Sequence, residues 1–393
     1  MKNLSYQKLQ TLQTPTYLYS EEVLRAQVKA LRESLPEEMG IFYSFKANSH
    51  ERLAKVLQSE GVGADVASVN ELKVALRAQF KSEHIEFTGP GKSEEALRLA
   101  IHSRIASIVV ESVEELLLIN QISTELKIVT SISLRVNPEL SVSATGKKLN
   151  KQSSQFGVDE DQAPEFFAIL KKCSHVKLVG LHVFSQSQIL SGQILEQNFA
   201  LTMAAILRLC VHLTQPLDMV NLGGGFGIPY YEGQSSLQMT SLKSALVQIL
   251  TEARKESVLQ AAKFFVESGR FIAGPAGVYA APVLYTKESQ GKRFVVLGGG
   301  FSHNMAVCGV GQILRRNYKT QVFQKQKDTS LETVTLVGPS CYALDTLAVD
   351  LALSRLVRGD WVIFENCGSY GASFSPMNFL SFAPAQERFI EDL

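Results

Sequence analysis

The chain has 393 residues, of which 45% are hydrophobic and 20% are charged, and its formal net charge is +1. This composition is typical of a globular protein long enough for two domains with substantial cores. The balanced charge favours neither nucleic acid nor an anionic membrane as a partner, and no apolar run is long enough to span a bilayer. The N-terminal residues lack the apolar core of a signal peptide, so we expect a cytoplasmic protein.

The cysteines argue against a metal site. They are scattered and odd in number, and no two of them form a CxxC pair: Cys173, Cys210, Cys308, Cys341 and Cys367. Structural zinc is therefore not expected, and no metal is predicted elsewhere in the chain.

Apolar, strand-like runs alternate with amphipathic stretches over the first two-thirds of the chain. The helical stretches include residues 51–57 and 112–119, and a serine followed by glutamates at 93–95 and 112–115 is typical of a helix N-terminus. The predicted strands are 40–46, 62–67, 84–89, 105–110, 129–136, 177–185, 217–222 and 262–267. This alternation predicts a parallel (β/α)8 barrel, with an open doubly wound sheet as the alternative.

Lys46 ends the first predicted strand, after an apolar and aromatic run. A lysine in apolar surroundings loses proton affinity and becomes a nucleophile that can form a Schiff base with an aldehyde cofactor. Alternatively, its long side chain simply reaches solvent from the strand end. The ends of the other predicted strands favour the first interpretation.

Polar, charged and glycine residues gather at the ends of the predicted strands, which form the active-site face of a (β/α)8 barrel. They include Lys46, Asp65, Ser68, Arg135, Asn137, residues 182–188, Gly223 to Gly225, and Glu267 to Arg270. A glycine turn can bind phosphate through its backbone N–H groups, and Arg270 adds a cation. Glu267 needs a partner in its apolar run, which is either a protonated pyridine nitrogen or Arg270.

The pattern changes after about residue 270. Short β-branched runs at 277–285, 293–297 and 361–364 predict a mostly antiparallel β domain, and residues 16–20 are a candidate extra strand of it. We therefore predict a barrel domain over residues 25–268 and a β domain formed by residues 1–24 and 269–393. The polar segment 141–156 is predicted to be a long loop that acts as a lid, contacts a partner or is a tolerated insertion.

Cys341 follows a Gly-Pro turn in Gly338-Pro339-Ser340-Cys341, which places it in a loop. It could deliver a proton to carbon, although most single cysteines only pack.

These motifs, in this order, resemble the pyridoxal-phosphate-dependent family of diaminopimelate, ornithine and arginine decarboxylases. That family combines an alanine-racemase-like barrel with a β domain. The matching segments cover nearly the whole chain and lie at 45–48, 63–68, 87–92, 134–138, 223–227, 267–270, 338–341 and 368–370.

The resemblance implies that Lys46 holds pyridoxal 5'-phosphate as the internal aldimine and that Cys341 protonates the product carbon. Cofactor contacts are implied for Lys46, Asp65, Phe184, Ser187, Gly224, Gly225, Glu267, Gly269, Arg270 and Tyr370, with Glu267 on the pyridine nitrogen. Substrate contacts are implied for Arg135, Arg316, Tyr318, Tyr342 and Asp345. In the family the loop that carries Cys341 usually comes from a second subunit, so a homodimer with shared active sites is expected.

The chain departs from the family at two informative positions. Where the family has an acidic residue after the cysteine that binds a distal amine, this chain has Tyr342. Where the family has a histidine that stacks on the cofactor ring, this chain has Phe184. These changes resemble a branch that includes the L-glutamyl-[acyl-carrier-protein] decarboxylase of butirosin biosynthesis and exosortase-associated decarboxylases. The features shared with that branch lie at 223–230, 315–318 and 369–376.

We therefore expect a decarboxylase that acts on an L-amino acid or on a carrier-protein-tethered aminoacyl group in secondary metabolism. The alternatives are a racemase or epimerase on the same fold, or a non-catalytic pyridoxal-phosphate-binding protein. The retained Cys341 and Asp345 favour catalysis. If an acyl carrier protein is the partner, Arg315, Arg316 or the 141–156 segment could contact it.

Overall fold

The computed structural model describes residues 4–12, 14–143, 146, 148–150, 153–310 and 316–393. The chain forms two compact units. The barrel unit consists of Val28–Gly227 and Ser236–Gly269. The β unit consists of the described residues up to Gln27, together with Ile228–Ser235 and Arg270–Leu393.

The barrel unit is built on parallel strands that close on themselves. They are β2 (Gly40–Ser44), β3 (Gly63–Val66), β4 (Ile85–Phe87), β5 (Ser107–Val110), β6 (Thr130–Asn137), β10 (Val176–Val183), β11 (Met219–Asn221) and β12 (Lys263–Ser268). Each pairs with the next in this order, and β12 pairs with β2 to complete the ring. A short strand, β9 (Val158–Asp159), pairs in parallel with the C-terminal end of β6. The predicted (β/α)8 barrel is confirmed, and the open-sheet alternative is wrong because β12 and β2 are paired.

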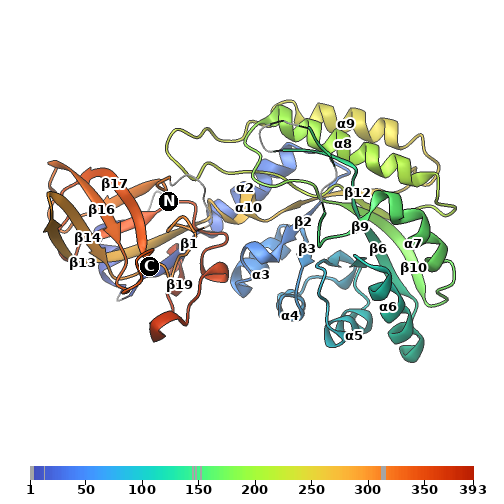
Figure 1. Ribbon diagram of the computed structural model, residues 1–393, viewed down its shortest axis with the longest axis horizontal. Coiled ribbons are helices and arrows are strands. Elements are labelled where there is room, and N and C mark those ends of the chain that lie inside the picture. The colour runs from blue at the N-terminus through green and yellow to red at the C-terminus, as the bar shows by residue number, and fades with distance from the viewer. Residues whose placement is uncertain (1–3, 13, 144–145, 147, 151–152, 311–315) are drawn as a thin grey trace. The chain divides into compact units, whose positions relative to one another are not determined.

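One helix precedes the first barrel strand and others follow the later strands along the chain, as Figure 1 shows for α3 and α4 near β2 and β3. They are α2 (Glu21–Glu33), α3 (Glu51–Ser59), α4 (Val69–Arg77), α5 (Glu94–Ser103), α6 (Val113–Leu126), α7 (Ala163–Leu170), α8 (Gly192–Cys210) and α9 (Leu242–Ala253), with the 3-10 turns η1 (Phe45–Ala47), η2 (Ser82–His84) and η3 (Glu160–Gln162). The predicted helix starts are confirmed, since the hydroxyls of Ser93 and Ser112 accept hydrogen bonds from the backbone of the first turns of α5 and α6.

Aromatic and aliphatic side chains fill the N-terminal end of the barrel. The rings of Phe42 and Phe265 lie 4.7 Å apart and pack with Val179 and Met219. Gly40 is required beside them because a side chain there would collide with the ring of Phe265. The interior of this end of the barrel is therefore apolar, and the polar side chains gather at the opposite end, where the strands have their carboxyl ends.

The β unit contains one mixed sheet. Its strands are β1 (Thr16–Tyr19), β13 (Gly277–Ser289), β14 (Lys292–Leu297), β15 (Thr320–Phe323), β16 (Leu331–Val337), β17 (Thr346–Ser354), β18 (Trp361–Phe364) and β19 (Gln386–Phe389). Most pairs are antiparallel, as predicted, but β1–β19 and β14–β16 are parallel. The prediction that residues 16–20 add a strand is confirmed by the pairing of β1 with β13. The short helices of this unit are α1 (Tyr6–Gln10), α10 (Arg270–Ala273), η4 (Ala372–Phe374), η5 (Phe379–Ser381) and η6 (Ile390–Asp392).

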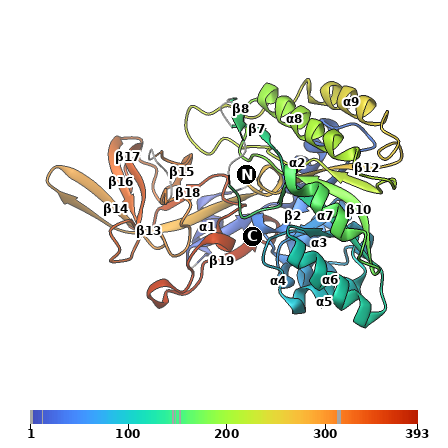
Figure 2. The same cartoon turned by 45° about the vertical axis from the view of Figure 1, so that its right-hand side comes forward.

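The 141–156 segment is not wholly a loop. The strands β7 (Leu140–Val142) and β8 (Lys148–Asn150) pair as an antiparallel hairpin, and Figure 2 shows the hairpin near α8. Residues 144–145, 147 and 151–152 lie outside the described residues, so its predicted role as a lid or partner contact remains a prediction. In the part of the chain that the structure describes, no helix combines the length and apolarity needed to cross a membrane.

Candidate active site

Lys46 lies just beyond the strand that was predicted to contain it. β2 ends at Ser44, and Lys46 is the middle residue of the 3-10 turn η1, whose neighbours Phe45 and Ala47 are buried. The lysine side chain is 46% exposed, so the expectation that the strand itself desolvates the amine is wrong. The turn instead carries Nζ to a position 4.0 Å from Asp65 Oδ2 and 5.6 Å from the centroid of the Phe184 ring.

Three carboxylates from different strands are buried at this end of the barrel. Asp65 on β3, Glu86 on β4 and Glu267 on β12 are 2%, 0% and 3% exposed. Asp65 accepts a hydrogen bond of 2.6 Å from the Thr88 hydroxyl. Sequence reasoning identified Asp65 and Glu267 but missed Glu86, although a glutamate in the short apolar run 85–87 was a usable signal.

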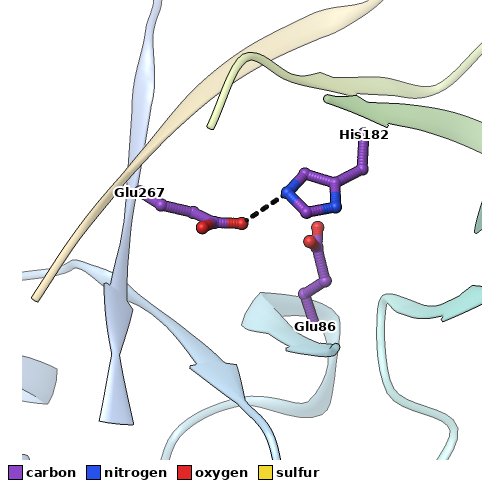
Figure 3. Close-up of side chains that lie close together, drawn as sticks. All are labelled: Glu86, His182 and Glu267. Atoms are coloured by element: carbon purple, nitrogen blue, oxygen red, sulfur yellow. Dashed lines mark ion pairs between the residues drawn. The ribbon is translucent and has the colours of Figure 1, made fainter. Parts of the chain in front are cut away.

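His182 on β10 joins this group. Its Nε2 lies 2.8 Å from Oε1 of Glu267, and Figure 3 shows Glu86 approaching the same imidazole from another strand. The contact is short enough for an ion pair, but its geometry is not that of an aligned hydrogen bond. The Nδ1 atom of His182 and Oε2 of Glu86 are buried without a hydrogen-bond partner.

The surroundings shift the pKa values of Glu267 and Glu86 in opposite directions. Burial alone would raise the pKa of Glu267, but His182, Lys46 and Arg135 outweigh it and lower that pKa to about 2. Burial raises the pKa of Glu86 well above its ordinary value, and repulsion from Glu267 and Asp65 adds to the shift. These surroundings therefore favour the anionic form of Glu267 and the protonated form of Glu86.

The glycine turn Gly223 to Gly225 follows β11 and packs closely on its neighbours. Gly223 and Gly225 have positive φ angles of 68° and 121°, a region that favours glycine. A side chain at Gly224 would lie 2.5 Å from the backbone oxygen of Glu267. The backbone N–H of Ile189 donates a hydrogen bond of 2.8 Å to the Gly225 carbonyl, which ties the segment containing the exposed Ser187 to the turn.

Gly269 lets the end of β12 approach the turn that carries Lys46. A side chain at Gly269 would lie 2.8 Å from Cβ of Ala47 and 3.1 Å from the Ser44 carbonyl oxygen. The barrel unit therefore brings together Lys46, Asp65, Phe184 and Glu267 and links Gly224, Gly225 and Gly269 to them through the backbone.

Arg135 on β6 is held by partners of its own. Its Nη1 lies 3.3 Å from Oε1 of the buried Glu111, and its guanidinium carbon lies 4.8 Å from the centroid of the Phe156 ring. Glu111 also accepts hydrogen bonds from the backbone N–H groups of Gly89 and Gly157. The predicted contact of Arg135 with substrate remains a prediction.

Within the β unit, Arg270 and Tyr370 lie together. The Arg270 guanidinium donates a hydrogen bond of 2.7 Å to the Tyr230 hydroxyl, and its carbon lies 4.6 Å from the centroid of the Tyr370 ring. Tyr318 packs on Tyr230 with ring centroids 5.1 Å apart. The Arg316 guanidinium lies 4.7 Å from the Tyr231 ring, while Arg315 falls outside the described residues.

The loop between β16 and β17 presents an exposed Cys341. Tyr342, the next residue, packs edge-on against Phe301 and Phe379 with ring centroids 5.0 and 5.7 Å apart. The Asp345 carboxylate is buried and accepts hydrogen bonds from the backbone N–H groups of Phe301 (2.6 Å) and Ser340 (2.9 Å). Its two carboxylate oxygens thus link the loop that carries Cys341 to the backbone at Phe301.

Glu86, His182 and Glu267 form a group whose ligand atoms all lie within 4.8 Å of one another, which is close enough to share a metal ion. His182 Nε2 lies 2.8 Å from Oε1 of Glu267 within this group.

Comparison with known proteins decides the family. The model of the pyridoxal binding domain of pyridoxal-dependent decarboxylases matches residues 21–274. The chain belongs to this family. It is 34% identical over 371 residues to an L-glutamyl-[BtrI acyl-carrier protein] decarboxylase of Niallia circulans, covering 94% of this chain and 86% of that protein. It is 30% identical to the diaminopimelate decarboxylase of Aquifex aeolicus, covering 93% of this chain and 84% of the relative.

A solved structure agrees. The diaminopimelate decarboxylase of Helicobacter pylori, complexed with L-lysine, superimposes with a TM-score of 0.86 at 27% identity, and the match covers 99% of this chain and 95% of that one. The protein is thus a pyridoxal-phosphate-dependent decarboxylase, as the sequence motifs predicted, and its cofactor is pyridoxal 5'-phosphate.

The residues present fit that cofactor. Lys46 offers an accessible amine at the carboxyl end of the barrel, and Glu267 offers a buried anion suited to a protonated ring nitrogen. The Phe184 ring, close to Nζ of Lys46, offers an apolar face against which a flat ring can stack.

Proposed function

We propose that this decarboxylase acts on an aminoacyl group tethered to a carrier protein, with a free L-amino acid as the competing substrate class. The observation that carries the proposal is Tyr342. It stands next to Cys341 and packs with Phe301 and Phe379, where the resemblance places an acidic residue that reads a distal amine. A neutral aromatic cluster gives a diamino acid no counter-charge. The 34% identical relative, whose name specifies a carrier-bound glutamyl substrate, supports the same choice.

Lys46 and Glu267 have separate tasks in this proposal. Lys46 attaches the cofactor covalently through its amine. Glu267, kept anionic by its surroundings, accepts a hydrogen bond from the ring nitrogen and keeps that nitrogen protonated. When bound, pyridoxal phosphate supplies a sink for the electron pair that remains after carbon dioxide leaves.

The remaining groups bind the cofactor's phosphate and deliver a proton. Ser187, the turn containing Gly225, Gly269 and Arg270 are proposed to hold the phosphate, and Tyr370 is proposed to fix the orientation of the Arg270 guanidinium. The Cys341 thiol is exposed at the tip of its loop and is proposed to donate a proton to the carbon that has lost its carboxylate.

A substrate screen tests the proposal. Carbon dioxide release should be at least about tenfold faster with a glutamyl group on a phosphopantetheinylated carrier protein than with free lysine, ornithine or diaminopimelate, because the aromatic cluster lacks a charge for a distal amine. If the carrier protein itself is recognised, free glutamate should also be turned over more slowly than the tethered glutamyl group. Equal or faster turnover of a free amino acid would contradict the carrier assignment. A product of inverted configuration, found by chiral analysis without any release of carbon dioxide, would instead identify a racemase.

Lys46→Ala tests the attachment site. The variant should lose the aldimine absorbance of the cofactor, and borohydride should no longer fix the cofactor to the chain, because no other amine replaces Lys46 as the covalent partner. Lys263→Ala is a matched control, since Lys263 lies at the start of β12, at the opposite end of the barrel. An aldimine that borohydride still traps on the chain in Lys46→Ala would refute the assignment.

A further inference from the structure

Asn221, the last residue of β11, uses its side chain to connect two parts of the site. It is 1% exposed. Its Nδ2 donates hydrogen bonds of 3.0 Å to Oε1 of Glu267 and 3.0 Å to Oε1 of Glu86. Its Oδ1 accepts a hydrogen bond of 2.9 Å from the backbone N–H of Gly223. Both donor hydrogens and the acceptor of this buried amide are therefore engaged.

The backbone joins the same two parts. The N–H of Glu267 donates a hydrogen bond of 2.9 Å to the carbonyl oxygen of Gly223. Gly224 lies so close that a side chain there would reach within 2.5 Å of the Glu267 carbonyl oxygen. The glycine turn cannot shift without moving either β12 or the Asn221 side chain.

We propose that Asn221 is a positioning residue that couples the two ends of the cofactor site. One buried amide sets the direction of the Glu267 carboxylate, which serves the ring nitrogen, and the conformation of the glycine turn, which serves the phosphate. The inference rests on the assignment of Glu267 and this turn to the cofactor.

The chemistry of the amide explains why asparagine suits this position. It can donate to two carboxyl groups and accept from a backbone N–H at the same time, without adding charge. An aspartate of nearly the same shape would still accept from Gly223, but it would lose both donations and place a third acid beside Glu86 and Glu267. A serine would leave the two carboxyl groups short of a donor.

Binding of pyridoxine 5'-phosphate to the cofactor-free full-length protein tests the coupling, because this probe lacks the aldehyde and does not depend on Lys46. Calorimetry should show about tenfold weaker binding for Asn221→Asp and Asn221→Ser. Inorganic phosphate, measured as a competitor, should also bind more weakly to both variants, because the turn loses its anchor. Asn120→Ala is the matched control. It removes an asparagine whose side chain accepts a hydrogen bond from the backbone of His175, before β10, and should change affinity by less than about twofold.

A double-mutant cycle with Glu267→Gln decides the outcome. If Asn221 acts through Glu267, the double variant should bind the probe at least about threefold more tightly than the product of the single losses predicts. Losses that simply multiply, or unchanged phosphate competition in both Asn221 variants, would overturn the inference and leave the assignment of Glu267 intact. If Glu267→Gln alone does not weaken binding, the assignment of Glu267 fails and the inference fails with it. Asn221→Asp, which is nearly isosteric, is the decisive variant if Asn221→Ser does not fold.

Discussion

At the scale of single residues, the barrel fixes which buried acids carry charge. The imidazole of His182 lowers the pKa of Glu267, whereas burial and two neighbouring acids raise the pKa of Glu86. Asn221 donates one hydrogen bond to each of these two carboxyl groups. The charge that a cationic ring nitrogen requires is thus concentrated on one carboxylate.

Glu86→Gln should stabilise the protein increasingly as the pH rises. The folded state keeps a proton on Glu86 that the unfolded chain releases above its ordinary pKa, so this group lowers stability as the pH increases through that range. Glutamine has no proton to hold and can still accept from Asn221. Chemical denaturation should show little difference between variant and parent near pH 4, and a gain of about 1 kcal/mol or more at pH 7.

The exposed Glu83→Gln, in η2 just before β4, is the matched control and should show no such trend. A loss of stability in Glu86→Gln that grows with pH would show that Glu86 is ionised in the folded protein.

At the scale of elements, the ends of strands and the turns that follow them place the chemistry. Lys46 was expected inside a strand, but the chain leaves β2 at Ser44 and forms a 3-10 turn, which brings the amine to the mouth of the barrel. The loop between β16 and β17 is fixed in another way, by hydrogen bonds from backbone N–H groups to the buried Asp345 carboxylate. Gly300 and Gly338 pack against that carboxylate, and a side chain at either position would collide with it.

Asp345→Asn should loosen the loop that carries Cys341. The carboxylate accepts two backbone hydrogen bonds, and the amide can replace only one of its two oxygens as an acceptor. Turnover should fall about tenfold while the cofactor absorbance stays unchanged, because the loop is proposed to deliver a proton rather than to bind cofactor.

The rate of Cys341 alkylation by iodoacetamide should change in the same variant. Asp350→Asn, on the exposed part of β17, is the control for both measurements. Parental turnover and parental alkylation in Asp345→Asn would show that the carboxylate does not position the loop.

At the scale of the whole molecule, the two units have different cores and carry different parts of the proposed chemistry. Lys46 and Glu267 belong to the barrel unit, whereas Arg270, Tyr370 and Cys341 belong to the β unit. The family resemblance implies that the loop carrying Cys341 usually comes from a second subunit. We therefore expect a homodimer in which each site uses residues of both chains.

Mixing two inactive variants tests this arrangement. Lys46→Ala and Cys341→Ala homodimers should each be nearly inactive. Subunit exchange between equal amounts should restore about a quarter of the parental activity, because half of the dimers are mixed and each mixed dimer has one complete site. No recovery, despite exchange confirmed by native mass spectrometry, would place Lys46 and Cys341 of one site on the same chain.

Much of the fold was predictable from the sequence because it depends on local patterns. Each barrel strand lies within about two residues of its predicted range, since apolar runs bounded by turn residues define strands without reference to their partners. The serines that begin α5 and α6 were visible for the same reason, because a helix cap involves residues close in sequence. The order of the family's motifs then identified the cofactor.

Tertiary structure alone decided which side chains meet. Glu86 and His182 lie on β4 and β10, and only closure of the barrel brings them to Glu267 on β12. The charge states of these groups follow from burial and from neighbours that are distant in sequence, and neither can be read from a local pattern. The exposure of the Lys46 side chain likewise depended on where β2 ended and η1 began. The sequence by itself determined the helices, the strands and the family, because each of these depends on short segments of the chain. The contacts of Asn221 and Glu267 join residues that are distant in sequence, so they required the closed barrel.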